Sequence, residues 1–288
     1  MAVALPLAQR RKSRASPVIM IVGTLLFLFV ALAILAPWIA PADPARQDLL
    51  ARLKPPGFVG RNVVTYWFGT DNLGRDLLSR VLYGAGASLG VAVLSVMVST
   101  VIGVSLGMAA GWLRGWTEVV IMRLVDIIMS IPAVLLAVLT VAVLGPGLWN
   151  LVIVLGFTRW PRYARVAYGQ TLQVATQPYI RASELAGAGT LRMLIAHVLP
   201  NIAGPILVVA TAEFGLMILF EAGLSFLGLG IQPPAPSWGS IMSVGREYVD
   251  RAWWIVAFPG VALFLLVFSV NLLGDWLRDR IDPRSRNR

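Results

Sequence analysis

The chain has 288 residues, of which 58% are hydrophobic and 13% charged, and its mean hydropathy is +0.78. Soluble domains are about half apolar and a quarter charged, so this composition predicts an integral membrane protein. The absence of cysteine excludes disulfides and thiol catalysis, and a single histidine argues against a metal site. We therefore expect no metal and no cofactor. The net charge of +10 fits arginines on the cytoplasmic side of a membrane better than nucleic-acid binding.

Long, uninterrupted apolar runs dominate the chain. A helix crosses the hydrocarbon core with about 20 apolar residues, so the length accommodates about six passes. Only helices and closed barrels satisfy the backbone in lipid, and these runs lack the alternation of a barrel. We predict an all-α, polytopic membrane bundle of six transmembrane helices.

The first run is free of charge over residues 15–42 and follows a basic cluster, Arg10, Arg11, Lys12 and Arg14. It is much longer than the roughly 7–15 apolar residues of a secretory signal peptide. We predict a retained transmembrane helix over 18–40, between an N-terminal tail (1–17) and an outer loop (41–80). The second run, residues 81–113, carries small residues at four-residue spacing, which predicts a close helix-packing face: Ser99, Gly103, Gly107 and Gly111.

A third helix is predicted over Val119–Leu144, because a Gly-Pro-Gly turn signal follows it. The fourth helix begins near Leu148. After about three turns it meets a proline and three arginines: Arg159, Pro161, Arg162 and Arg165. Its lower end must therefore leave the bilayer or line a polar interior.

The fifth and sixth helices are predicted over Ile202–Leu227 and Trp253–Leu273. Helices two to six would form one core domain over residues 81–275, followed by a C-terminal tail over 276–288. Six passes place both termini on one side of the membrane. Most of the 24 lysines and arginines fall on the same side as the termini, so the positive-inside rule predicts that both termini are cytoplasmic.

The segment 178–200 is a compact amphipathic element that this orientation places in the cytoplasm. Arg181 and Glu184 lie three residues apart and can pair on one helix face. Gly187 and Gly189 then break the helix. A second turn follows with an apolar stripe made of Leu191, Leu194, Ile195 and Val198. Two short helices bury little area on a lipid surface, so docking into a groove of a cytoplasmic partner is the better interpretation.

This segment resembles the cytoplasmic EAA loop of ABC importer permeases, through Gly187 and the Leu199-Pro200 pair that begins twelve residues further on. The glutamate usual in that family is Arg181 here, followed by Ala182 and Ser183. The resemblance implies a coupling helix that contacts the ATPase subunit, with these residues involved: Arg181, Ala182, Ser183, Glu184, Gly187, Leu191, Leu194, His197, Leu199 and Pro200.

Four further stretches are similar to the dipeptide/oligopeptide permease type, in its second membrane subunit: "WFGTDNLGRDLLSRVLYG" (67–84), "DIIMSIP" (126–132), "LSFLGLGIQPPAPSWGSIM" (224–242) and "NLLGDWLRDRIDPR" (271–284). The resemblance implies a type I ABC importer permease that forms the pathway for di- or oligopeptides in the inner membrane, or for nickel or another small solute. Its implied partners are a second homologous permease, two cytoplasmic ATP-binding subunits and an extracytoplasmic substrate-binding protein.

No P-loop motif occurs, and the only lysines are Lys12 and Lys54. Because a P-loop needs its lysine at the nucleotide phosphates, ATP hydrolysis is assigned to separate subunits and the chain is predicted to be non-catalytic. A rival from another class is an ion-coupled secondary transporter, in which Asp126 and Glu213 would be the coupling carboxylates. That class predicts internal repeats, and no convincing repeat is visible.

Three carboxylates lie within or at the ends of predicted membrane helices, where charge is expensive. Asp126 is interpreted as one half of a structural ion pair beside Arg123. Glu213 is a candidate for a polar pathway or a subunit contact, and Glu221 is expected to fix the outer end of its helix, with a substrate role as the alternative. His197 is interpreted as an interface histidine.

The outer segment before the second helix carries Asp71, Arg75 and Asp76 between two turn glycines, Gly69 and Gly74. An arginine between two carboxylates argues against a metal site. Side-chain pairing would instead fix the turns. The family resemblance implies an outer scaffold near the translocation mouth or the binding protein.

Overall fold

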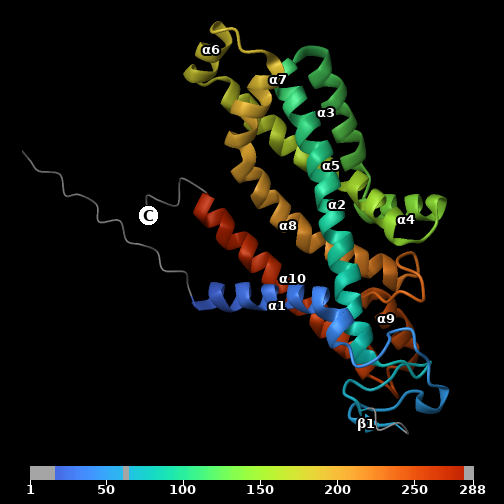
Figure 1. Cartoon of the computed structure of the whole chain (residues 1–288). Helices are drawn as coiled ribbons and strands as arrows, with labels where there is room; N and C mark the ends of the chain where they lie inside the picture. Colours follow the sequence, from blue (N-terminus) through green and yellow to red (C-terminus); the bar gives the residue numbers. More distant parts are fainter. Residues whose placement is uncertain (1–16, 61–64, 282–288) are drawn as a thin grey trace, which may run out of the picture.

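A computed structural model describes residues 17–60 and 65–281 of the chain (Figure 1). Of the two predicted tails, residues 1–16 of the first and 282–288 of the second lie outside the described residues. The main helices are α1 (Pro17–Ile39), α2 (Leu77–Leu113), α3 (Gly115–Ser130), α4 (Ala133–Leu144), α5 (Leu148–Ala175), α8 (Leu199–Phe226) and α10 (Trp254–Ile281). Shorter elements are η1 (Leu49–Ala51), β1 (Phe58–Val59), β2 (Thr65–Tyr66), α6 (Pro178–Leu185), α7 (Thr190–Arg192), η2 (Met193–Val198), α9 (Trp238–Gly245) and η3 (Arg246–Tyr248).

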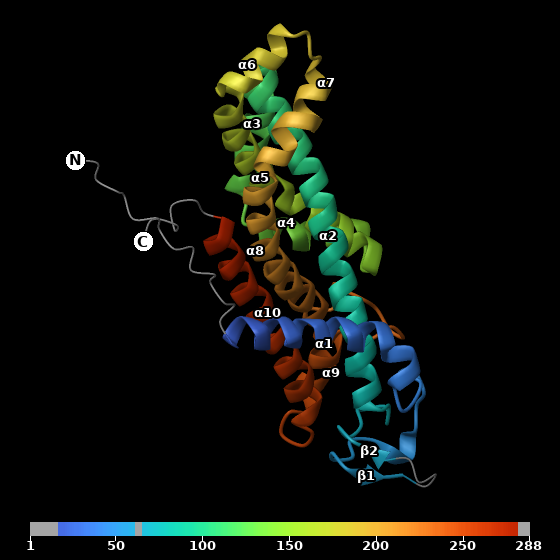
Figure 2. The same cartoon turned by 60° about the vertical axis from the view of Figure 1, so that its left-hand side comes forward.

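The prediction of an all-α membrane bundle is confirmed. Four helical segments are long and apolar enough to span a bilayer, namely α1, α2, Thr190–Phe226 and α10, and the bent pair α3–α4 makes a fifth. The predicted count of six is met when α5, whose arginines lower its hydropathy, is counted with them. Figure 2 shows α1 crossing α2 and α10, the two helices on which it packs.

The predicted third helix is not continuous. It breaks after α3, and α4 leaves at an angle of 91° (Figure 1). The break lies at Ile131-Pro132, where Ile131 adopts an extended conformation. Proline disfavours the helical conformation of the residue before it, which explains why the chain bends here.

The fourth helix, in contrast, continues through Pro161 for 28 residues as α5. Membrane helices tolerate an internal proline where neighbouring groups bond to the freed backbone. The carbonyl that Pro161 frees is that of Phe157, four residues earlier, and Ser99 of α2 donates to the adjacent carbonyl of Gly156, with an Oγ–O distance of 3.0 Å. Of the two alternatives expected for the lower end of this fourth helix, the structure favours a polar interior, because Arg159 and Arg162 of α5 turn toward a carboxylate of α8.

The packing face predicted on α2 is confirmed. Helices α2 and α5 share the most extensive helix–helix contact in the described chain. A Cβ added to Gly103 or Gly107 would lie 2.4 or 2.3 Å from a backbone oxygen of α5, and one on Gly111 would lie 2.8 Å from Thr171 Cβ. The two backbones therefore approach closely only because these side chains are absent.

The two ends of the bundle carry different structures. Helices α6 and α7 lie at one end, and the β1–β2 hairpin lies at the other (Figure 1). The hairpin end also holds α9, which begins with a capping box formed by Ser237 and Ser240. Trp238 is buried there, and its Nε1 donates to the carbonyl of Val81 at 2.9 Å. This contact ties α9 to the first turns of α2.

Candidate functional site

The segment 178–200 folds as two helical pieces joined by a glycine turn. Helix α6 has Pro178 in its first turn, where the missing N–H does no harm. The turn after it contains Gly187 with a φ of 85°, a left-handed conformation that favours glycine. From Thr190 onward the chain is continuously helical to Phe226. Leu199-Pro200 begins α8, where a proline in the first turn is tolerated.

One face of this segment is anchored in the bundle. Ile180, Met193 and Val198 are fully buried, and Leu194 packs against the cluster that contains Val198 and Ile202. The opposite face presents apolar side chains to the outside: Leu185 is 90% exposed, Leu191 71% and Ile195 56%. Of the predicted apolar stripe, Leu194 and Val198 pack into the bundle, whereas Leu191 and Ile195 are exposed.

The polar residues of the segment tie its two pieces together or face outward. Ser183 Oγ of α6 and His197 Nε2 of η2 share a hydrogen bond of 3.3 Å. Arg181, Ala182 and Glu184 are exposed. The predicted pairing of Arg181 with Glu184 is wrong: no ion pair joins them in the described chain, whose ion pairs all lie elsewhere.

Glu213 is the centre of a charge cluster inside the bundle. Its carboxylate is 1% exposed and accepts from Arg159 Nε at 2.9 Å and from Arg162 Nη1 at 3.0 Å. Arg159 also lies over the ring of Phe220, 5.0 Å from its centre. One carboxylate is therefore shared by two arginines, and the cluster keeps a net positive charge.

Glu221 is fully buried and is satisfied by hydroxyl groups instead of cations. Ser88 of α2 and Ser225 of α8 each donate to one of its oxygens at 2.7 Å. The carboxylate links the C-terminal part of α8 to α2, as expected of a group that fixes this end of the helix. With no exposed surface, it offers no face to a substrate in this conformation.

Asp126 forms the expected ion pair, but the predicted partner is wrong. It bonds to Arg165 of α5, not to Arg123 one turn away on its own helix. Tyr168 of α5 donates a hydrogen bond to Glu118 of α3. Both links join α3 to α5, and the Asp126–Arg165 pair is half exposed, at 55% and 50%.

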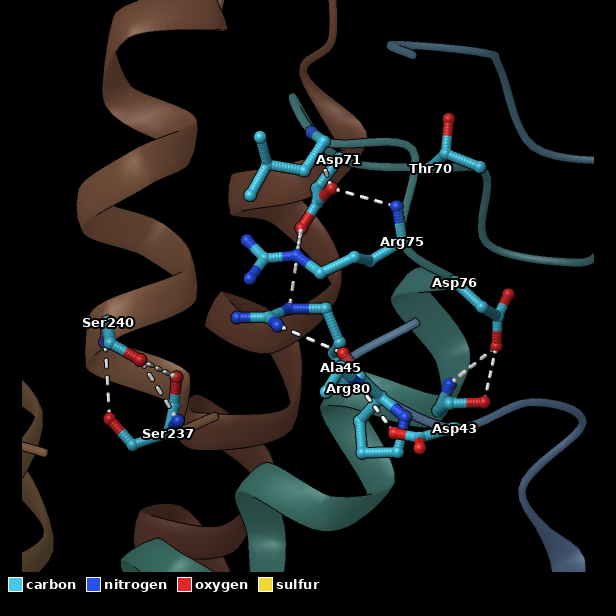
Figure 3. Close-up of polar contacts among 12 residues, drawn as sticks. Asp43, Ala45, Thr70, Asp71, Arg75, Asp76, Arg80, Ser237 and Ser240 are labelled. Carbon is cyan, nitrogen blue, oxygen red and sulfur yellow. Dashed lines mark hydrogen bonds and ion pairs between the residues drawn. The ribbon is translucent and has the colours of Figure 1, made fainter. Parts of the chain in front are cut away.

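The segment before α2 contains a buried polar cluster (Figure 3). Asp71 binds Arg75 Nε at 2.6 Å and lies 3.5 Å from Arg80 Nε, while Gly69 and Gly74 adopt positive φ values of 77° and 71°. A Cβ on Gly74 would lie 1.7 Å from the carbonyl oxygen of Asp48. The predicted role of side-chain pairing in fixing these turns is confirmed.

Asp76 is the N-cap of α2, where its carboxylate accepts from Ser79 N at 2.8 Å. Burial raises the pKa of Asp76, and the hydrogen bonds from Ser79 oppose this shift. The same unit is fastened to α10, because Trp254 Nε1 donates to the carbonyl of Thr70 at 3.1 Å. No group of three metal-binding side chains occurs within residues 17–60 and 65–281.

The functional residues that sequence reasoning missed are the partners of the buried carboxylates. Arg159 and Arg162 were recognised as unusual within a membrane run, but they were not connected with Glu213. Their spacing of three places both on one helix face, which is a usable signal. Arg80, which is buried beside Asp71, carried no comparable signal.

The fold and these clusters define a multi-pass helical membrane protein with charges inside the bundle and an amphipathic segment at one end. Residues 103–287 match the family described as "Binding-protein-dependent transport system inner membrane component", and residues 9–56 match the N-terminal transmembrane domain of oligopeptide transport permease C. The chain belongs to this family of inner-membrane transport components.

Two similar relatives cover almost the whole chain. The di/tripeptide transport system permease protein DppC of Pseudomonas aeruginosa is 45% identical over 92% of this chain and 88% of its own length. The dipeptide transport system permease protein DppC of Escherichia coli K12 is 45% identical over 95% of this chain and 90% of its own length. The fold is also similar to a chain of the inward-facing MetNI methionine ABC transporter, with a TM-score of 0.59 and 20% sequence identity. The match covers 72% of this chain and 98% of that chain.

Proposed function

We propose that this chain is a permease subunit of an ATP-driven importer and forms part of the translocation pathway for di- or oligopeptides. The observation that carries the proposal is the similarity at 45% identity to two peptide transport permeases over at least 92% of the chain. The polar interior around Glu213 supports it, because charges inside a membrane bundle mark solute pathways.

The segment 178–200 is the contact for the ATPase subunits in this proposal. Its buried face, including Met193 and Val198, continues into α8, so a displacement of the segment is transmitted to the helix that carries Glu213. Its exposed apolar side chains, Leu185, Leu191 and Ile195, are suited to a groove on a partner protein. Closure of the ATPase dimer would then tilt the membrane helices.

The orientation follows from the same assignment. We infer that both termini and the segment 178–200 are cytoplasmic, and that the hairpin end with Asp71 and Arg75 faces outward, toward a substrate-binding protein. The arginine distribution supports this arrangement. Because the chain lacks cysteine, single cysteines at Leu50 and Leu185, both exposed, should react with an impermeant maleimide from opposite sides of the membrane.

The proposed complex contains a second homologous permease, two ATP-binding subunits and an external binding protein, and this chain catalyses no reaction. The rival, an ion-coupled transporter, needs carboxylates that release protons or ions. Glu213 is held by two arginines and Asp126 by one, so both carboxylates already have cationic partners within the chain. This observation favours the ATP-driven importer.

Reconstitution in proteoliposomes tests the proposal. Peptide uptake should require both the ATPase subunits and ATP, and should persist when the proton gradient is collapsed at constant ATP. Uptake that continues without the ATPases would refute the ATP-driven mechanism. ATP-dependent uptake of a solute other than peptides would leave the permease role intact and correct the substrate.

A further inference from the structure

A cavity of about 850 Å³ lies between α5, α8 and α10, within the roughly 300–1,000 Å³ range of ligand pockets. It begins at Glu213 in the middle of α8 and reaches the ends of α5 and α10. Its polar lining consists of Arg162, Gln170, Gln173, Asn201, Glu213 and Arg278.

Charge inside this cavity is unbalanced. Arg159 and Arg162 share the single carboxylate of Glu213, so the cluster carries one excess positive charge. Arg278 adds a second cation at the rim. Asp275 lines an adjoining cavity together with Arg278, but no ion pair joins the two in the described residues. An anion in the cavity would offset the excess charge in a region where unpaired charge is expensive.

Arg162 is the side chain placed to bind that anion. Its side chain is 57% exposed, whereas those of Arg159 and Glu213 are largely buried. A guanidinium has five N–H groups, and within the described chain Arg162 donates only through Nη1, to Glu213. Its remaining N–H groups present the fork that matches a carboxylate with two parallel hydrogen bonds.

We propose that this cavity binds the main-chain carboxylate of the transported peptide, and that Arg162 is the residue that recognises it. The inference rests on the proposed peptide transport. A terminal carboxylate is common to unblocked peptides of any sequence, so one arginine serves many substrates. Gln170, Gln173 and Asn201 offer amide groups that can pair with peptide main-chain groups. Glu213 holds Arg162 in position by accepting the hydrogen bond from its Nη1.

The test uses the whole transporter, this chain with its partner permease and ATPases, in phosphatidylcholine nanodiscs without nucleotide or binding protein. Binding of labelled dialanine is measured, with dialanine amide as competitor. The wild-type complex should bind dialanine and prefer it to the amide. Arg162→Gln should weaken dialanine binding by about tenfold or more and abolish the preference, whereas Arg162→Lys should retain part of it.

Arg165→Gln is the matched control, because Arg165 lies on the same helix but pairs with Asp126 of α3 instead of facing the cavity. This variant should bind dialanine as the wild type does. The inference is overturned if the wild-type complex binds no dialanine, or if Arg162→Gln leaves affinity and preference unchanged. It is also overturned if added phosphatidylglycerol displaces dialanine from the wild type, since the cavity would then hold a lipid headgroup.

Uptake measured in parallel separates this inference from the proposed function. If wild-type uptake proceeds without ATP, the ATP-driven importer is refuted whatever Arg162 binds. If uptake requires ATP and Arg162→Gln still distinguishes dialanine from its amide as the wild type does, only the carboxylate site is refuted.

Discussion

Replacing Gly107 with alanine should destabilise the contact between α2 and α5. The added Cβ would lie 2.3 Å from the carbonyl oxygen of Ala164 and 2.8 Å from Ala167 Cβ. Carbon atoms prefer separations of about 3.5–4.0 Å, so the helices must move apart by about 1 Å. The obstructing oxygen belongs to the backbone of α5 and has no rotamer with which to withdraw. Overpacking of this kind costs about 1–3 kcal/mol.

Gly90 provides a matched control on the same helix. A Cβ at this position meets nothing within 4 Å. Alanine gains about 1 kcal/mol of helix propensity over glycine at either position, so this gain cancels when the two variants are compared. We expect Gly107→Ala to be about 1–3 kcal/mol less stable than Gly90→Ala. Denaturation of the purified chain in mixed micelles, followed by tryptophan fluorescence, measures the difference. Equal stability of the two variants would refute the close approach of α2 and α5.

Gly187→Ala should uncouple ATP hydrolysis from uptake, because a left-handed φ of 85° costs a residue with a side chain about 1–2 kcal/mol. Gly189→Ala is the control and should be tolerated, because Gly189 has a φ of −70°. The measurement is the ratio of peptide taken up to ATP hydrolysed. Asp126→Asn should change the free energy of unfolding by less than about 1 kcal/mol, because its ion pair is half exposed, and a larger loss in micelle denaturation would contradict this. Because the pKa of Asp76 is raised in the folded state, protonated Asp76 favours folding below pH 3.8, and this contribution is lost as the pH rises through the folded pKa. Asp76→Asn retains an N-cap but does not titrate, so the free energy of unfolding of the wild type should fall relative to that of the variant as the pH rises through this range. A difference that stays constant with pH would contradict this.

Features encoded locally were predictable from the sequence. The glycine ridge of α2 follows from spacing alone, since residues four apart share a helix face, whereas only the structure identifies α5 as its partner. The break at Gly187 and the paired turn at Asp71 and Arg75 are likewise local. At these positions, backbone preference and tertiary structure agree.

Features that depend on which helices pack together were not predictable. Asp126 was assigned to Arg123 because the two are neighbours on one helix, but the packing of α3 on α5 brings Arg165 to it. The bend before α4 was missed because an internal proline has two outcomes. At Pro132 the helix ends, whereas at Pro161 the surrounding helices hold α5 together. Periodicity alone does not distinguish these cases.

The link between Glu213 and the two arginines of α5 is the most informative feature that needed the structure. Arg159 and Glu213 are 54 residues apart in the chain, and no pattern in either helix specifies that they meet. Once α5 and α8 are in contact, the expense of unpaired charge in a membrane explains the cluster. The position of the cavity beside it follows from the packing of α10.

The coupling role of the segment 178–200 is tested most directly by a photo-crosslinking residue at Leu191, with a second at Leu139 of the membrane helix α4 as the control. Both side chains are exposed, at 71% and 64%. In the intact transporter, crosslinking from position 191 should capture an ATPase subunit, and crosslinking from position 139 should not. If position 191 captures only lipid, the segment is not the contact through which ATP hydrolysis moves the membrane helices.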